Sequence, residues 1–330
     1  MSSRARSSFP KIAVVTPLYN ESEALPRYFR EVGELLLDNS GCDVRLILVD
    51  DGSQDRSWQM LREACGKDER VSALRLSRNF GSHAAIAAGL NAVPDDIDAV
   101  VVMACDLQDP PAVALEFVEQ WRQGADIVWG QRTGRRDARW RIAASTVFEA
   151  MLRRWALPRG SLFTTGSFFL ADRRVVEAMR AMQEHNRITF ALVAWTGFDQ
   201  ARVPYQRAER VSGRSKWGVR RMLKTMYDAF VGFSTLPIRL MKAAATAAFL
   251  LALGLVAYLL VIAAVTRTSV PGWTSQMLVL SVFFGIQFSL TAMIGEYLAR
   301  IYQESVARPA YFVSELADIG TEPERVGRGP

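Results

Sequence analysis

Acidic side chains follow three short apolar runs of this sequence, each at the point where a β-strand is expected to end. Residues 14–21 read VVTPLYNE, residues 48–53 read LVDDGS and residues 102–111 read VMACDLQDPP. In open α/β sheets, ligands bind at the carboxyl ends of the strands. Carboxylates there can accept hydrogen bonds from a ribose or a base. We therefore expect a binding site that these three segments share.

The third run places Asp106 where a divalent cation could bridge it to a diphosphate, because Mg²⁺ is commonly held by one or two carboxylates plus substrate phosphates. Asp109 stands before two prolines, and we expect it to cap the following helix, with proline in the first turn. Taken alone, residues 50–53 are equally well explained as a turn with a helix cap. The chain has no GxGxxG or GxxxxGK sequence, which argues against dinucleotide-binding and P-loop folds.

Short β-branched runs alternate with helical patterns over the first two thirds of the chain. This alternation predicts an α/β domain with a largely parallel sheet. The expected strands are 12–16, 45–49, 73–76, 99–103 and 127–130, and the expected helices are 24–37, 58–65, 84–91 and 112–121.

Composition narrows the class of protein. The chain has 330 residues, 50% of them apolar, and a formal net charge of +6, which would suit nucleic acid, an anionic membrane or a phosphorylated substrate. Its three cysteines are not spaced as metal ligands or as a redox pair, which indicates a reducing compartment. With only two histidines, the chain cannot build a histidine-rich metal site. Residues 1–10 are polar and are not followed by an apolar run, so we predict a disordered N-terminus and no cleaved signal peptide.

The apolar residues after position 235 favour a membrane over nucleic acid. Segments 243–265 and about 277–297 are almost uncharged, and each is long enough for a hydrocarbon core that needs about 20 residues. Basic residues flank the pair on both outer sides, whereas the turn between them holds Arg267 alone, so both termini should be cytoplasmic. The amphipathic pattern of residues 216–233 predicts a helix. It could pack on the catalytic domain or lie on the bilayer surface, and we favour the bilayer surface because the segment directly precedes a predicted span.

The ordered motifs TPLYNE (16–21), VDDGS (49–53), SRNFG (77–81), DLQDPP (106–111) and GRSKW (213–217) resemble family 2 glycosyltransferases. Within that family they are similar to the polyprenyl-phosphate sugar transferases, which include dolichol-phosphate mannose synthases and bactoprenol glucosyltransferases. The resemblance runs from about residue 11 to 315. It implies a GT-A fold, a nucleotide-sugar donor, a polyprenyl-phosphate acceptor and inversion at the anomeric carbon.

The same resemblance implies roles for individual residues. Asp106 and Gln108 would hold Mg²⁺ or Mn²⁺, while Arg132, Arg214 and Lys216 would grip phosphates as part of the catalytic set. The nucleotide sugar would be bound by Pro17, Tyr19, Glu21, Asp50, Asp51, Ser77, Arg78 and Asn79.

Two positions depart from the family pattern. Ala104 stands where many members have the first carboxylate of an Asp-x-Asp metal site. Ser167 stands where some members carry an Asp that is a proposed base. A phosphate monoester has a second pKa of about 6, so such an acceptor arrives mostly ionised and needs no strong base. Ser167 is included in the catalytic set as the residue at that position.

The predicted organisation is a GT-A domain followed by a transmembrane hairpin. The disordered N-terminus covers 1–10, the catalytic domain 11–212, the juxtamembrane helix region 213–236, the two spans 237–299 and a cytoplasmic tail 300–330. Paired hairpins would suit a homo-oligomer in the cytoplasmic membrane. Two alternatives remain. One is a catalytically silent scaffold of the same fold. The other is a processive polysaccharide synthase, although such enzymes usually carry a QxxRW motif and more membrane spans, and this sequence shows neither.

Overall fold

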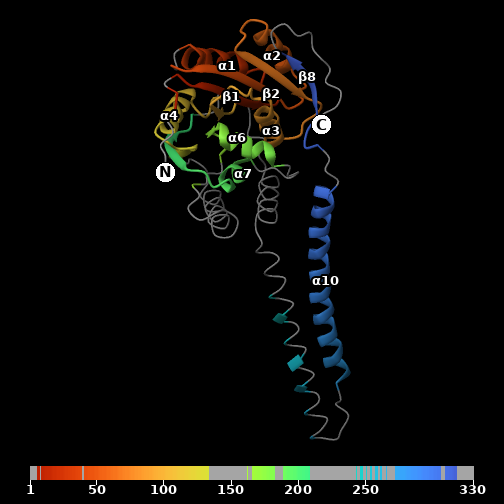
Figure 1. Cartoon of the computed structure of the whole chain (residues 1–330). Coiled ribbons are helices and arrows are strands. Elements are labelled where there is room, and N and C mark those ends of the chain that lie inside the picture. Colours follow the sequence, from red (N-terminus) through yellow and green to blue (C-terminus); the bar gives the residue numbers. More distant parts are fainter. Residues whose placement is uncertain are drawn as a thin grey trace. The chain divides into compact units, whose positions relative to one another are not determined.

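A computed structural model of the chain describes most of the predicted catalytic domain and part of the region after it (Figure 1). It describes residues 6–7, 9–38, 41–133, 162, 166–182, 189–208, 272–305 and 309–317, and isolated residues at 243, 246–247, 250, 253–254, 257–258, 261 and 265. The chain divides into two units. One consists of Met1–Ala229 and Pro309–Pro330, and the other is Phe230–Arg308.

The first unit is built on an eight-stranded mixed sheet with the strand order β7-β5-β6-β4-β1-β2-β3-β8. Strands β3, β2, β1 and β4 are parallel, as the alternating pattern predicts. β6 runs antiparallel to β4 and β5, β7 runs parallel to β5, and β8 runs antiparallel to β3. The strands are β1 Lys11–Leu18, β2 Asp43–Asp50, β3 Val71–Leu76, β4 Ala99–Val102, β5 Ile127–Thr133, β6 Phe169–Asp172, β7 Gln200–Gln206 and β8 Val313–Ala317.

The described helices of this unit connect strands that follow one another in the sequence. They are α1 Leu25–Val32, continued by the π-helical turn η1 Gly33–Leu37, then α2 Ser57–Cys65, α3 Ser82–Ala92, α4 Pro111–Arg122, α6 Arg173–Ala181 and α7 Thr189–Trp195. All five strands and four helices predicted from the sequence are confirmed, to within a few residues at their ends. Strands β6, β7 and β8 and helices α6 and α7 were not predicted.

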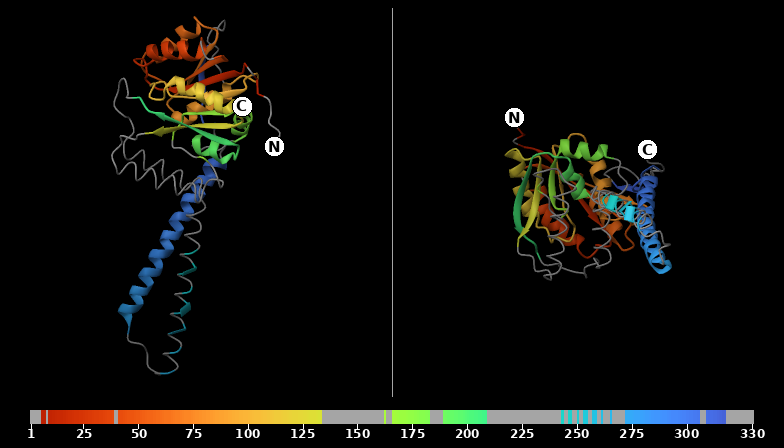
Figure 2. Two further views of the ribbon diagram at one scale, coloured as in Figure 1. Left: turned by 90° about the vertical axis from the view of Figure 1, so that its left-hand side faces the viewer. Right: turned by 90° about the horizontal axis from the view of Figure 1, so that it is seen from below.

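The central strands β1 and β4 are mostly apolar because this part of the sheet is covered on both faces. All four residues of β4 are buried, and in β1 the residues Ile12–Thr16 are buried without a break. Helix α3 packs very closely on this sheet: a Cβ at Gly89 would lie 2.4 Å from Cγ1 of Val15. Strands β5, β6 and β7 lie side by side although long segments separate them in sequence (Figure 2). The topology therefore brings the carboxyl ends of β1–β5 and β7 to one edge of the sheet.

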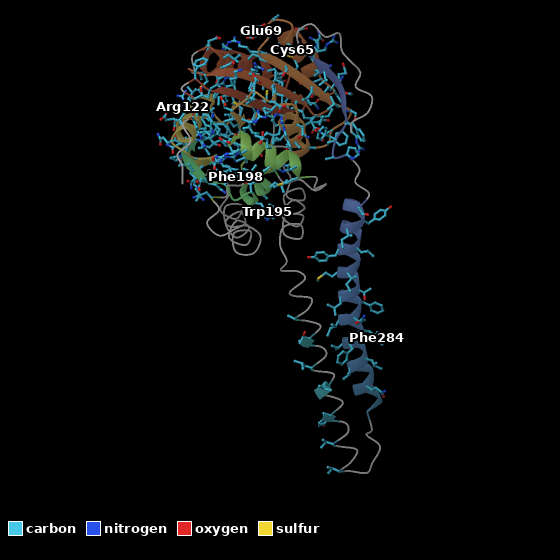
Figure 3. All side chains as sticks on the ribbon, viewed as in Figure 1. Cys65, Glu69, Arg122, Trp195, Phe198 and Phe284 are labelled. Carbon is cyan, nitrogen blue, oxygen red and sulfur yellow. The ribbon has the colours of Figure 1, made fainter. Side chains whose placement is uncertain are left out.

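In the second unit, Trp273–Ser305 forms the 33-residue helix α10. Its described apolar side chains include Phe284 (Figure 3), which is 55% exposed and stacks on Phe288 with 6.3 Å between ring centroids. Within the part of the chain that the structure describes, no helix is both long enough and apolar enough to cross a membrane. The two-span hairpin stays a prediction. Residues 209–242, which include the expected amphipathic helix, lie outside the described residues.

Candidate active site

The loops after β1 and β2 are joined by hydrogen bonds. The backbone N–H of Asn20 donates to Oγ of Ser53 (2.8 Å), and the N–H of Gln54 donates to Oδ1 of Asn20 (2.8 Å). The N–H of Glu21 donates to Oγ of Ser57 (3.0 Å). Asn20 has a φ of 53°, a left-handed conformation that asparagine adopts more readily than most residues. These contacts place the TPLYNE and DDGS segments in one structure, as the sequence predicts.

Asp51 ties this pair of loops to the one after β3. Its carboxylate accepts hydrogen bonds from the N–H groups of Phe80 (2.7 Å) and Gly81 (2.9 Å). Burial raises the pKa of Asp51 to about 6, although these two bonds oppose the rise. At neutral pH the side chain is therefore mostly an ionised carboxylate in a buried position, a state that a donor group of a ligand would stabilise.

Gly52 permits the close approach of the two loops. Its φ is +71°, and a Cβ there would lie 2.6 Å from the carbonyl carbon of Arg78 and 2.9 Å from the Arg78 Cα. Since these are backbone atoms, only glycine fits this position. The preceding residue, Asp50, is fully buried, accepts a hydrogen bond from the Ser53 N–H (3.0 Å) and lies 3.3 Å from Nε of Arg75.

The loop after β4 holds the predicted metal ligands. Oδ1 of Asp106 accepts a hydrogen bond from the N–H of Gln108 (3.2 Å), and the N–H of Ala208 donates to the Gln108 carbonyl (2.9 Å). Leu107 between them has a φ of 52°, which is strained for a leucine. Strain of this kind is kept where surrounding structure holds it, often at functional sites.

These two side chains suit a divalent cation that takes its remaining ligands from a substrate. Among the described residues, no group of three or more His, Cys, Asp or Glu side chains could hold a metal. A carboxylate and an amide oxygen two residues apart match the sparse oxygen set that Mg²⁺ uses with substrate phosphates. Burial raises the pKa of Cys105, and the carboxylates of Glu21 and Asp106 raise it further.

Asp109 does not cap α4, and that prediction is wrong. The helix N-cap is Pro110, with no side-chain capping bond from the described residues. The buried carboxylate of Asp109 instead accepts a hydrogen bond from the hydroxyl of Tyr205 at the end of β7. Two guanidinium groups lie near the same oxygen: Nη2 of Arg132 at 3.9 Å and Nε of Arg207 at 3.8 Å. The carboxylate turns to these cations because they share its edge of the sheet.

Arg132, Tyr205, Asp109 and Arg207 form a charged cluster beside Asp106. Nε of Arg132 donates to the Tyr205 hydroxyl (3.3 Å). Burial acts to lower the pKa of Arg132, but Asp109, Tyr205 and Asp106 together raise it above the ordinary arginine value. The pKa of Arg207 is lowered by burial and by Arg132, against the pull of Asp109 and Asp106. Both side chains remain cations, and the cluster can bind an anion such as phosphate.

The structure places the other predicted site residues around these loops. Pro17 lies in β1 opposite Val49, Tyr19 follows β1, and Ser77, Arg78 and Asn79 are exposed after β3. Ser167 precedes β6 and follows Gly166, where an added Cβ would lie 3.7 Å from Nη2 of Arg132. Ser167 therefore lies near the charged cluster. Arg214 and Lys216 lie outside the described residues.

Sequence reasoning missed Tyr205, Arg207 and Arg75. None of them lies in one of the five family motifs, and each acquires its partners from a distant segment. His83 at the start of α3 joins this helix to α7: its Nδ1 lies 3.2 Å from Oγ1 of Thr189, and its ring packs on Phe190. Burial lowers the pKa of His83 to about 4, so it is neutral at physiological pH.

Residues 13–180 match the model of the family described as glycosyl transferase family 2, and this match covers half of the chain. The chain is a family 2 glycosyltransferase. Its mixed sheet is the GT-A-like fold that the sequence resemblance implied. Catalysis of glycosyl transfer is thereby established as its class of activity.

Relatives of this glycosyltransferase match almost end to end. An uncharacterised glycosyltransferase of Bacillus subtilis, YkcC, is 34% identical over 323 residues, 96% of each chain. The undecaprenyl-phosphate 4-deoxy-4-formamido-L-arabinose transferase of Proteus mirabilis is 35% identical over 317 residues, 94% of each chain. Among solved structures, a mannosyltransferase from Pyrobaculum calidifontis in complex with GDP-Man and Mn²⁺ matches at 15% identity, over 86% of this chain and 87% of that one, with a TM-score of 0.43.

Proposed function

We propose that this glycosyltransferase moves a sugar from a nucleotide-sugar donor to a polyprenyl phosphate of the undecaprenyl type, with inversion at the anomeric carbon. The observation that carries the proposal is the meeting of Asp51, Asp106 and the Arg132 cluster at one edge of the sheet. The match to relatives named as undecaprenyl-phosphate sugar transferases, over more than nine tenths of both chains, supports the lipid acceptor.

The interlocked loops after β1, β2 and β3 are the proposed nucleotide site. The ionised Asp51 would accept hydrogen bonds from the base or ribose, and Asp50 would hold the loop in place beneath it. Pro17, Tyr19 and Glu21 would form one wall, and the exposed Ser77, Arg78 and Asn79 would form the other. This assignment follows the family resemblance, and the hydrogen bonds of Asn20 and Asp51 that join the three loops support it.

Asp106 and Gln108 would hold Mg²⁺ or Mn²⁺ together with the donor diphosphate. The cation would offset the negative charge that develops on the leaving diphosphate. Since Ala104 replaces the other expected carboxylate, the protein contributes a single negative charge at this point, and we expect metal affinity to depend on bound donor.

The acceptor phosphate would bind beside Arg132, with Arg214 and Lys216 as further phosphate contacts. An oxygen of the lipid phosphate attacks the anomeric carbon, the bond from that carbon to the donor diphosphate breaks, and the nucleoside diphosphate leaves with the electron pair. The acceptor is already ionised near neutral pH, so no proton need be removed by Ser167. Positioning and charge stabilisation by the arginines would supply most of the catalysis.

We further propose that segments 243–265 and 277–297 span the cytoplasmic membrane, with the catalytic domain and both termini in the cytoplasm. The uncharged runs and the asymmetry of Lys and Arg around them support this topology. Tags fused at Met1 and Pro330 should be digested by protease in inside-out vesicles, whereas a tag at Ser269 should be protected. Protection of the Pro330 tag would refute the topology.

The function is tested with purified full-length protein, undecaprenyl phosphate, Mg²⁺ and a panel of nucleotide sugars. The panel includes UDP-4-deoxy-4-formamido-L-arabinose, UDP-glucose and GDP-mannose, and products are identified by mass. A polyprenyl-phosphate sugar from one donor is the expected result. Parallel reactions replace the lipid phosphate with an oligosaccharide or a protein acceptor. If one of these acceptors is glycosylated and undecaprenyl phosphate is not, the lipid-phosphate assignment is wrong.

A further inference from the structure

Strand β8 follows the proposed membrane spans in the sequence and lies beside the loop after β3, which belongs to the proposed donor site. β8 (Val313–Ala317) lies antiparallel to β3 at the edge of the sheet, with Leu76 opposite Val313 and Arg75 opposite Glu315. The N–H of Ser77, at the start of the SRNFG loop, donates to the carbonyl of Phe312 (2.9 Å). The chain thus returns to the catalytic domain after α10 and completes the sheet beside the predicted nucleotide loops.

Arg75 connects this strand to the loop after β2. Its Nη1 donates to Oε1 of Glu315 (3.0 Å), and its Nη2 donates to the backbone carbonyl of Ser53 (2.9 Å). Its Nε lies 3.3 Å from the fully buried carboxylate of Asp50. All three nitrogens of the guanidinium group therefore face partners, two of them in the DDGS loop and one in β8.

Glu315 holds the guanidinium group in this orientation. Its second carboxylate oxygen accepts a hydrogen bond from Nε1 of Trp58 (3.0 Å), and the ring of Trp58 lies under the Arg75 guanidinium at 5.9 Å. Both charged side chains are about 70% covered, with 30% of Arg75 and 28% of Glu315 exposed. A charge pair this well covered and bonded at both ends keeps a fixed geometry better than a fully exposed one.

We propose that Glu315 is a positioning residue for the nucleotide site, acting through Arg75 on the Asp50–Ser53 loop. The inference rests on the proposed function, in which that loop binds the donor. Without Glu315, Arg75 loses one of its two carboxylates and can turn away from Ser53. Since Ser53 also accepts a hydrogen bond from the Asn20 N–H, the disturbance would reach the β1 loop as well. Donor affinity should fall, while the phosphate cluster around Arg132 should keep its contacts.

The test uses the full-length chain and measures binding of UDP and GDP in the presence of Mg²⁺. Glu315→Gln should weaken binding of the preferred nucleotide about three- to tenfold, a coupling typical of residues in one charged network. The donor KM should rise in parallel, with kcat at saturating donor within about twofold of wild type. The matched control is Ser314→Ala, which removes a hydrogen bond from β8 to the Arg75 carbonyl (3.2 Å) and leaves the side-chain contacts of Glu315 and Arg75 in place. This control should bind nucleotide like the wild type.

A double-mutant cycle identifies the route. In an Arg75→Met background, Glu315→Gln should have no further effect on nucleotide affinity, because its action depends on Arg75. The proposal is overturned if Glu315→Gln lowers only the melting temperature and leaves nucleotide affinity unchanged, or if its effect adds fully to that of Arg75→Met. If the wild type binds neither nucleotide, the donor site itself is wrong and the inference falls with it.

Discussion

The hydroxyl of Tyr205, at the end of β7, donates a hydrogen bond to the buried carboxylate of Asp109, 96 residues earlier in the chain. The same hydroxyl accepts a hydrogen bond from Nε of Arg132. One phenol group therefore sets the distance between a buried acid and the arginine that we assign to the acceptor phosphate.

Tyr205→Phe should lower kcat/KM for the lipid phosphate about tenfold, because Arg132 loses an acceptor and Asp109 loses a donor, each worth about 1 kcal/mol. Steady-state kinetics with varied acceptor would measure this. Thr133→Val is the matched control, since it removes a hydrogen bond to the Tyr205 carbonyl (3.0 Å) without touching the hydroxyl. Equal effects of the two substitutions would contradict a specific role for the phenol.

Asp106→Asn should lower kcat at least about 100-fold while the protein still folds, since Asp106 is the carboxylate left at the expected metal position and charge stabilisation of a leaving group is worth a few kcal/mol. The substitution should also abolish the dependence of nucleotide affinity on Mg²⁺. Asp96→Asn, which alters an exposed ion pair with Lys11 (2.8 Å), is the control for loss of one negative charge. Near-normal turnover in Asp106→Asn would disprove the metal assignment.

Gly52→Ala should destabilise the protein by more than about 2 kcal/mol and weaken nucleotide binding. The added Cβ would meet backbone atoms of Arg78 at 2.6 and 2.9 Å, and φ of +71° is unfavourable for alanine. Thermal unfolding and nucleotide titration would show both effects. Gly33→Ala, where nothing lies within 4 Å of the new atom, should be neutral or slightly stabilising. A Gly52→Ala protein with wild-type stability would mean that the loops do not approach this closely.

Asp51 should give the protein a measurable pH dependence of stability. The pKa of Asp51 is raised to about 6 in the folded protein, mainly by burial, against about 3.9 in an unfolded chain. Between these values the folded state binds a proton that the unfolded state has lost, so the contribution of Asp51 to stability decreases as pH rises from about 4 to 6.

The comparison of wild type with Asp51→Asn isolates this effect. The melting temperature of the variant minus that of the wild type should increase across this pH range and level off above it. His83, whose pKa is lowered to about 4, destabilises the fold as pH falls below about 6.5, but does so in both proteins and cancels in the difference. A difference that is flat with pH would show that Asp51 has an ordinary pKa.

Acceptor ionisation should control the pH profile of the reaction. At saturating donor, which removes changes in the Asp51 site, the rate should climb through pH of about 6 and then level off, following the second phosphate ionisation. A neutral polyprenol should not be glycosylated.

Ser167→Ala should retain most of the activity, since a serine hydroxyl is not a base without a partner. A variant that binds both substrates but fails in the chemical step would show that Ser167 takes part in it.

The sequence alone determined the parallel half of the sheet and the loops that follow its strands. Strands β1, β2 and β4 could be predicted because burial on both faces demands uninterrupted apolar runs, and the DDGS and DLQDPP segments are local signals of strand ends. The meeting of Asp51 and Asp106 at one edge then follows from the rule that parallel strands share their carboxyl ends.

Only the tertiary structure decided which distant side chains complete the site. Asp109 is followed by a helix and reads locally as a cap, but Tyr205, Arg132 and Arg207 offer its carboxylate stronger partners. The five-residue strand β8 is too short for its pattern to indicate a strand, and its pairing with β3 joins Glu315 to Arg75 across 240 positions. The hydrophobic pattern of a segment indicates which of its residues are buried. The partner of a charged side chain depends on the order of the strands in the sheet, and a local pattern does not contain that order.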